Sequence, residues 1–186
     1  QARWRDLMAP IRRRLVFLVL AGVVLALLGC DASGPDASRE LAIQGILSAS
    51  LSESGDLAVI GSIHHGANVW DLSRGERLFD WNLKPGEKTV FRAVALSGDG
   101  RRAVTAEDRS LAVWDATSGQ SVGFWKASDK VLAIAIDREG RLAVIGQQNN
   151  QAVIFDLVKG AELFILPHAA EVYAVAIDAA AGVVMT

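Results

Sequence analysis

An aromatic residue followed directly by aspartate recurs three times along this chain, and this repeat constrains the fold more than any other feature. The three pairs are Trp70-Asp71, Trp114-Asp115 and Phe155-Asp156. They are separated by 44 and 41 residues, and the glycines Gly55, Gly100 and Gly140 keep a similar spacing of 45 and 40 residues. Repeats of roughly 20 to 50 residues are typical of solenoids, propellers and arrays, in which each unit packs mainly against its neighbours.

Each repeat is predicted to form four short β-strands. In the second unit, runs rich in Val, Ala and aromatic residues cover residues 91–97, 103–105, 111–114 and 121–125. Turns built from Gly, Asp and Ser separate these runs, as hairpins require. The first and third units follow the same scheme, and a fourth begins with runs at 172–177 and 183–185. No segment after Cys30 keeps a helical apolar period over the length of a helix, so we expect the folded part to be all-β.

This pattern resembles the WD-repeat family of β-propellers, in which four-stranded blades are arranged radially. The resemblance covers residues 41–186 and implies three complete blades and the start of a fourth. The expected blades span residues 41–84, 88–128, 129–168 and 169–186. Because propellers generally close with roughly four to eight blades, we expect this sequence to be part of a longer propeller of seven blades.

The resemblance also implies roles for the repeated residues. In this family the aromatic residue of each pair packs between neighbouring blades, and the aspartate orders the turn that follows. The family places another aspartate six residues before the tryptophan, which only Asp108 matches, and a histidine before the first strand of a blade, which only His168 matches. His64 and Asn149 occupy the other aspartate positions. We therefore expect the family's buried hydrogen-bond network to be incomplete in this chain.

The first thirty residues have a different character from the rest of the chain. Residues 1–29 carry five Arg and one Asp, a net charge of +4, whereas residues 30–186 carry 14 basic and 20 acidic residues, a net charge of −6. Three arginines precede an uninterrupted apolar run at residues 15–28. A helix of that length spans about 21 Å, which is short of the roughly 30 Å hydrocarbon core of a bilayer. A basic start and a short apolar run predict an N-terminal signal helix for export rather than a permanent membrane span.

The apolar run ends in Leu27-Leu28-Gly29-Cys30, which resembles the lipobox of bacterial lipoproteins. The resemblance implies that the signal is cut between Gly29 and Cys30, and that the Cys30 thiol receives a diacylglycerol. The new amine is then acylated, and several acyl chains are needed because a single chain binds a membrane only marginally.

The position of this motif sets the expected organisation of the N-terminal region. Met8 would start a well-formed signal of 22 residues, so residues 1–7 are expected to lie upstream of the start or to lengthen the signal. Residues 30–40 are expected to form a flexible linker between the anchor and the propeller. In some lipoproteins an aspartate after the cysteine favours retention at the inner membrane, so Asp31 favours that membrane, and the choice between inner and outer membrane stays open.

The sequence shows no pattern that predicts a catalytic or metal site. A single cysteine excludes an internal disulfide and a zinc site built on several thiolates. The adjacent pair His64-His65 would point to opposite faces of an extended segment, so a solvated turn is expected rather than a metal centre. There is no Gly-x-Ser-x-Gly elbow and no phosphate-binding loop, and the periodic aspartates fit turn chemistry. We therefore expect no enzymatic activity, no catalytic residue, no bound metal and no cofactor.

Two sets of residues, a pair of tryptophans and a group of arginines, can each be interpreted in two ways. Trp81 and Trp125 lie 44 residues apart on expected outer strands, where they either pack between blades or face a partner protein. Arginines such as Arg101 and Arg138 recur beside the first turn of each unit, where they form a solvated rim or bind an acidic partner.

The function expected from these features is protein binding at a membrane. The chain is expected to be a lipid-anchored lipoprotein of the bacterial cell envelope, facing the periplasm or the exterior, whose propeller binds other proteins through its loops and top rim. A net charge of −2 argues against nucleic acid as a partner, and no small-molecule substrate is expected. Two alternatives stay open, since a fold does not set a function: a factor that assists outer-membrane protein assembly, and an enzyme with a central metal or quinone held by further blades.

Overall fold

The computed structural model describes residues 45–84, 86 and 89–186, and every regular element in them is a β-strand. The first antiparallel sheet contains β1 (Ile46–Leu51), β2 (Leu57–Ser62), β3 (Ala67–Asp71) and β4 (Glu76–Trp81). The second contains β5 (Ala93–Leu96), β6 (Arg102–Glu107), β7 (Ser110–Asp115) and β8 (Ser121–Lys126). The third contains β9 (Val131–Ile136), β10 (Leu142–Gln147), β11 (Gln151–Asp156) and β12 (Ala161–Pro167). The predicted all-β fold is confirmed for this part of the chain.

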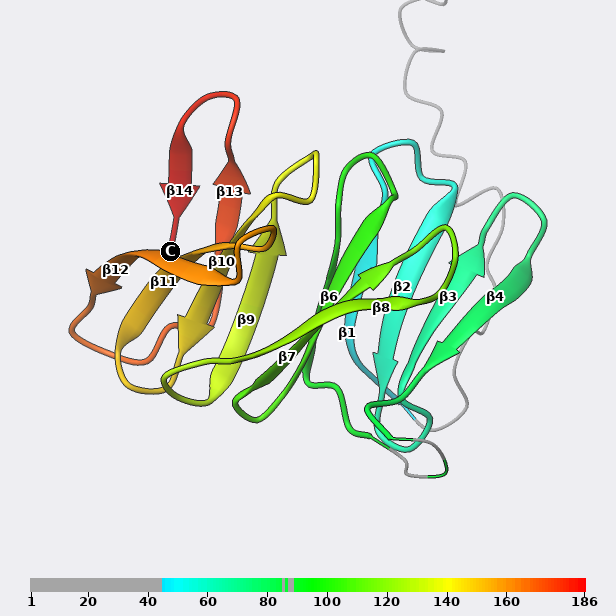
Figure 1. The fold of residues 1–186 in the computed structure, drawn as a ribbon, viewed down its shortest axis with the longest axis horizontal. Helices are drawn as coiled ribbons and strands as arrows, with labels where there is room; N and C mark the ends of the chain where they lie inside the picture. The colour runs from blue at the N-terminus through cyan, green and yellow to red at the C-terminus, as the bar shows by residue number, and fades with distance from the viewer. Residues whose placement is uncertain (1–44, 85, 87–88) are drawn as a thin grey trace, which may run out of the picture. The chain divides into compact units, whose positions relative to one another are not determined.

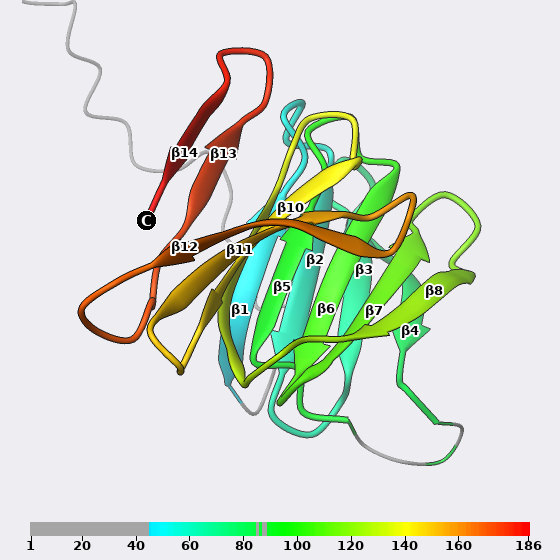
Figure 2. The ribbon, with the colours of Figure 1, turned by 60° about the vertical axis from the view of Figure 1, so that its left-hand side comes forward.

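The strands of each sheet pair in the order in which they follow one another along the chain. We label the four strands of a sheet a to d, so that β1, β5 and β9 are a strands and β4, β8 and β12 are d strands. The a strands of neighbouring sheets contact one another, while the d strands lie at the outer edges (Figure 1). The turns between strands a and b all lie along one edge of the molecule, the upper edge in both ribbon views (Figure 2).

The middle strands of each sheet are buried on both faces. Strand β2 has the sequence Leu-Ala-Val-Ile-Gly-Ser and β10 the near-identical Leu-Ala-Val-Ile-Gly-Gln, and all but the first residue of each is buried. Continuous apolar runs, rather than alternation, are expected when a sheet is covered on both sides. The d strands β8 and β12 are largely exposed. The sheets therefore pack face to face through their inner strands.

Successive residues of β6 show how the second sheet is held between its neighbours. Ala103 belongs to an apolar cluster shared with Val59 and Val69 of the first sheet. Val104, the next residue, belongs to a cluster shared with Val131 and Ile145 of the third sheet. Because successive side chains of a strand point to opposite faces, one strand contributes to both interfaces.

Outer-strand tryptophans pack against the aromatic residues of the repeated pairs in the next sheet. Trp81 on β4 stacks on Trp114 on β7, with ring centroids 5.0 Å apart and an interplanar angle of 9°. Trp125 on β8 meets Phe155 on β11 edge to face, with centroids 6.0 Å apart. The Trp81 Nε1–H also donates a hydrogen bond to the carbonyl of Gly119 at 2.9 Å. Both tryptophans thus take part in packing between sheets, and only 2% of the Trp81 surface stays exposed.

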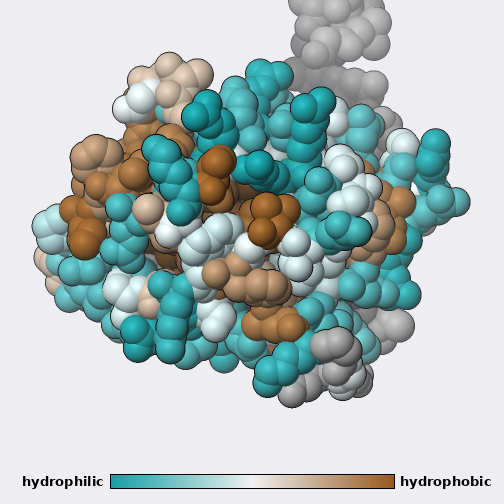
Figure 3. All heavy atoms as spheres, in the orientation of Figure 1, coloured by the Kyte–Doolittle hydropathy of each residue, from teal (hydrophilic) through white to brown (hydrophobic). Residues whose placement is uncertain are grey.

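A two-stranded hairpin follows the third sheet. It pairs β13 (Ala176–Asp178) with β14 (Val183–Met185) and packs on the third sheet through an apolar cluster that includes Val144 and Val172. Strand β13 is shorter than the expected run at 172–177, and the Val172 N–H bonds the carbonyl of Gln147 on β10 rather than a strand of its own sheet. Near this hairpin, apolar surface gathers over the β12 side of the molecule, where Phe164 is 64% exposed (Figure 3).

The expected signal helix, the cleavage position at Gly29 and the lipidation site Cys30 lie outside the described residues. Within the part of the chain that the structure describes, no helix is long and apolar enough to cross a lipid bilayer.

Candidate functional site

The turns between strands a and b begin alike in all four units. A serine or aspartate stands where strand a meets its turn, at Ser52, Ser97, Asp137 and Asp178. The Ser97 hydroxyl accepts a hydrogen bond from the Arg102 N–H at 2.9 Å. The Asp137 carboxylate accepts bonds from the N–H groups of Arg141 and Leu142 at 2.7 and 2.9 Å. Such side-chain bonds to nearby backbone define the turns, because they replace strand pairing with a local partner.

Backbone hydrogen bonds join the a–b turns of the first three sheets to one another. The Glu53 N–H donates to the Gly98 carbonyl at 2.9 Å, and the Asp99 N–H donates to the Arg138 carbonyl at 3.0 Å. The turns of the first three sheets thereby form one continuous surface, which we call the a–b turn face. A side chain on this face is held in position by the sheets beneath it.

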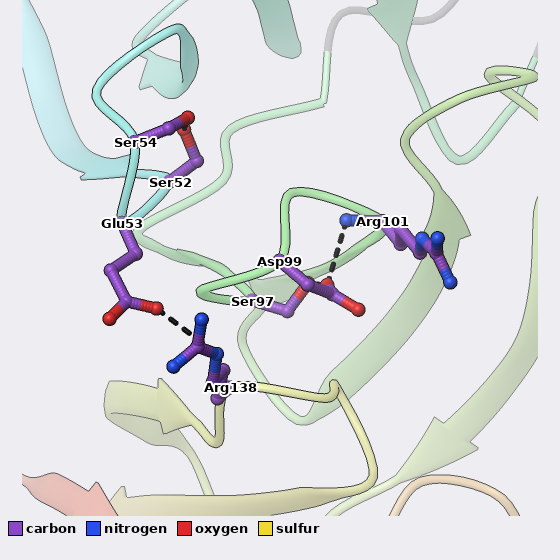
Figure 4. Close-up of polar contacts among 7 residues, drawn as sticks. All are labelled: Ser52, Glu53, Ser54, Ser97, Asp99, Arg101 and Arg138. Carbon is purple, nitrogen blue, oxygen red and sulfur yellow. Dashed lines mark hydrogen bonds and ion pairs between the residues drawn. The ribbon is translucent and has the colours of Figure 1, made fainter.

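An ion pair on the a–b turn face links the first sheet to the third. Arg138 Nε lies 3.2 Å from a Glu53 carboxylate oxygen, and the two side chains point toward each other in Figure 4. The pair passes over Gly98, where a Cβ would lie 3.1 Å from Arg138 Cγ and 3.4 Å from the Glu53 carboxylate. Because both side chains are more than half exposed, we expect about 0.2–1 kcal/mol from the pair, so its main effect is to orient two charges.

A cleft of about 520 Å³ opens in the a–b turn face. Its apolar lining comes from aliphatic residues at the ends of the a strands, namely Leu51, Leu96, Ile136 and Ile177. Its charged lining comes from Glu53, Arg138, Glu139 and Asp178. Neighbouring units thus place equivalent residues around one opening, which we call the mouth cleft. An apolar floor ringed by charges is suited to binding a segment of another protein.

The repeated aspartates lie in the turns between strands c and d. The Asp115 carboxylate accepts hydrogen bonds from the Thr117 N–H at 2.8 Å, the Thr117 hydroxyl at 2.6 Å and the Ser118 N–H at 2.9 Å. These hydrogen bonds stabilise the charged carboxylate, and the bond from the Thr117 hydroxyl contributes most. Together they lower the pKa of Asp115 to about 2. Asp71 and Asp156 accept bonds from their own turns in the same way, and their pKa values are also lowered.

The buried polar network is complete in only part of the molecule. In the second sheet the Trp114 Nε1–H donates to the Thr105 hydroxyl at 2.9 Å, and both groups are buried. Ile60 holds the position of Thr105 in the first sheet, as the strand register shows. The Trp70 Nε1–H there is buried and has no hydrogen-bond partner among the described residues. The apolar substitution explains the unpaired donor.

The remaining residues singled out from the sequence lie on other surfaces. The Asp108 side chain is exposed and makes no hydrogen bond or ion pair within the described residues, although its backbone adopts a φ of 51° in the tight b–c turn. His168 bonds the Thr186 hydroxyl at 2.6 Å. His64 and His65 are exposed in the b–c turn of the first sheet. No group of three or more His, Cys, Asp or Glu in the described part of the chain is placed to hold a metal ion.

Sequence reasoning missed two features of the interfaces. One is the pairing of Glu53 with Arg138, for which the only signal was a glycine between them at position 98. The other is a pair of serines on β1, which bond the backbone of β5 in the next sheet. The Ser48 hydroxyl accepts from the Val94 N–H at 3.1 Å, and the Ser50 hydroxyl accepts from the Leu96 N–H at 2.9 Å.

Solved structures with the same architecture decide the fold. One is titled "Crystal structure of RRP9 WD40 repeats", with a TM-score of 0.65, 16% identity, and coverage of 75% of this chain and 44% of that chain. The described part of this chain has a WD40 propeller fold. A structure titled "Structure of U3-55K" aligns with a TM-score of 0.66 and 18% identity, over 78% of this chain and 47% of that chain. A structure titled "Kuenenia stuttgartiensis Hydrazine Synthase" aligns with a TM-score of 0.59 and 15% identity, over 75% of this chain and 40% of that chain.

A curated sequence relative matches half of this propeller chain. It is "Cilia- and flagella-associated protein 52" of Chlamydomonas reinhardtii, which is 34% identical over 99 residues. The match covers 50% of this chain and 15% of that protein, so the chain spans a small part of its relative's length. No family model matches the chain.

Proposed function

We propose that this chain is a protein-interaction module without enzymatic activity or cofactor, which presents the turns of a propeller to partner proteins. The supporting observation is that the a–b turns are bonded to one another and hold charged side chains around an apolar cleft. The WD40 fold is compatible with this role but does not set it. Binding through the loops and rim needs only a rigid scaffold, which the interdigitated sheets supply.

We further propose that the module is a bacterial envelope lipoprotein anchored through Cys30. The support is the sequence alone: a basic start, a 14-residue apolar run, and the lipobox-like Leu27-Leu28-Gly29-Cys30. Anchoring would confine the propeller to the membrane surface and raise its effective concentration near envelope partners.

Two experiments test these proposals separately. For the anchor, Cys30→Ser is expected to abolish incorporation of radiolabelled palmitate and to leave the precursor uncut, whereas Ser33→Ala is processed normally. Normal processing of the Cys30→Ser variant contradicts the anchor.

For the interaction role, the full chain is cross-linked in membranes of its native host and recovered in mild detergent. A defined, saturable partner is expected to cross-link to residues of the propeller loops. Recovery of the chain without any cross-linked partner, under conditions that cross-link a known envelope complex, contradicts the role.

A further inference from the structure

We propose that the mouth cleft docks a cationic, aliphatic segment of a partner protein, in which a Lys or Arg flanks a large apolar side chain. This inference rests on the proposed interaction function and names the surface and the chemistry of its partner. It follows from the shape of the cleft, from its charge, and from the ion pair that its arginine already makes.

The floor of the mouth cleft is apolar and belongs to the framework. Leu96 is 5% exposed and lies within the cluster between the first and second sheets. Ile136 and Ile177 are partly buried and pack against the clusters on either side of the third sheet. These side chains cannot fold away from solvent without moving a strand. An aliphatic side chain seated on them would remove apolar surface from water at no cost in rearrangement.

The rim of the cleft carries an excess of negative charge. A second cleft of about 500 Å³ adjoins the mouth cleft and shares Glu139 with it. Together they are lined by five carboxylates and two guanidinium groups, and Lys159 pairs with one of the carboxylates, that of Asp156, which leaves a formal excess of two negative charges. The carboxylates are those of Glu53, Asp137, Glu139, Asp156 and Asp178, and the guanidinium groups are those of Arg138 and Arg141. A cleft lined mainly by negatively charged groups attracts positively charged groups.

The arginine that lines the mouth cleft, Arg138, is engaged within the protein, which disfavours an acidic occupant. Arg138 is paired with Glu53 at 3.2 Å, and the Arg102 guanidinium donates to the Gly140 carbonyl at 3.1 Å. Glu139, by contrast, is exposed and makes no ion pair within the described residues. The charge left without an ion pair in the mouth cleft itself is therefore that of a carboxylate, which can take a cation.

The test measures binding of a synthetic peptide in which Lys and Leu alternate, compared with the peptide in which Glu replaces Lys. The full chain in nonionic detergent is titrated by calorimetry at 50 mM salt. The Lys-Leu peptide is expected to bind, and the Glu-Leu peptide is not. Binding is expected to weaken at 0.5 M salt, because exposed charges are then screened.

Two variants with opposite expected effects localise the peptide. Glu139→Lys is expected to weaken binding by about fivefold, and Arg138→Ala, which frees Glu53, to strengthen it by about twofold. Glu162→Lys is the matched control: it makes the same charge change at an exposed position on β12, away from the cleft, and is expected to leave binding unchanged. Unfolding of the variant cannot explain the stronger binding expected for Arg138→Ala, because unfolding would weaken binding.

The inference is overturned if the Lys-Leu peptide does not bind, if both peptides bind equally, or if Glu162→Lys and Glu139→Lys weaken binding to the same extent. This failure is separable from failure of the interaction function. If the native cross-linked partner is retained by the Glu139→Lys chain, the module still binds proteins but uses another surface.

Discussion

Two pairs of glycines provide a matched test of how the sheets pack. Gly160 in a c–d turn has a φ of +66°, and Gly182 in the β13–β14 turn has a φ of +67°. A Cβ at Gly160 would lie 1.8 Å from Nε1 of Trp125 in the preceding sheet, whereas a Cβ at Gly182 meets nothing within 4 Å. Alanine at the two positions therefore imposes the same backbone strain but only one clash between sheets.

The expected difference in stability follows from these distances. An L-residue in the left-handed region costs about 1–2 kcal/mol, and this cost applies to both variants. Overpacking a rigid interface costs a further ~1–3 kcal/mol, and this cost applies to Gly160→Ala alone. The second pair repeats the comparison: Gly119 (φ +75°) would place its Cβ 2.4 Å from Phe79, while Gly55 (φ +77°) faces open space.

The assay is urea unfolding of the full chain, followed by far-ultraviolet circular dichroism. Gly160→Ala and Gly119→Ala are expected to lower the free energy of unfolding by about 1–3 kcal/mol more than Gly182→Ala and Gly55→Ala, respectively. Equal losses within both pairs would refute the idea that c–d turn glycines seat the aromatic side chains of the preceding sheet.

Three further predictions concern hydrogen bonds at and near the interfaces. Thr105→Val leaves the buried Trp114 Nε1–H without its acceptor and is expected to cost about 1–3 kcal/mol in urea unfolding; an unchanged midpoint would show that this bond does not matter. Because the pKa of Asp115 is lowered from 3.8 to about 2, its charged form stabilises the fold above about pH 4, and this contribution is lost as the pH falls toward 2. Asp115→Ala is expected to flatten the dependence of unfolding free energy on pH between 4 and 2, and identical profiles for variant and parent would contradict the turn role. Ser50→Ala removes the acceptor for the Leu96 N–H and is expected to cost about 1 kcal/mol, with faster amide exchange at Leu96; unchanged exchange there would argue against the bond.

The strands and turns of each sheet could be predicted from the sequence because their determinants are local. In the second unit, two glycines and an aspartate at positions 98–100 mark a turn between two apolar runs, and strands β5 and β6 flank that turn. The differences were also local: the strands expected at 103–105 and 111–114 extend further into the turn between them, because Glu107 and Ser110 pair with each other. The strand boundaries of the second unit therefore differ from those expected by a residue or two, and the order of its strands is the one expected.

Contacts between sheets could not be predicted in the same way, because they depend on how distant repeats align in space. Glu53 and Arg138 lie in the turns of the first and third sheets and meet across Gly98, where a Cβ would lie 3.1 Å from Arg138 Cγ. The stack of Trp81 on Trp114 likewise requires the d strand of one sheet to lie over the c strand of the next. A periodic sequence predicts that such interfaces exist but does not specify which rings meet.

The account depends most on the claim that consecutive repeats fold into sheets that pack side by side, with the repeated aromatic residue at each interface. The most direct test is a nuclear Overhauser spectrum of the full chain with the indole protons of Trp81 and Trp114 assigned. Ring centroids 5.0 Å apart predict strong cross-peaks between the two indoles, although the residues belong to different sheets. Resolved indole signals with no cross-peak between Trp81 and Trp114 would contradict the account.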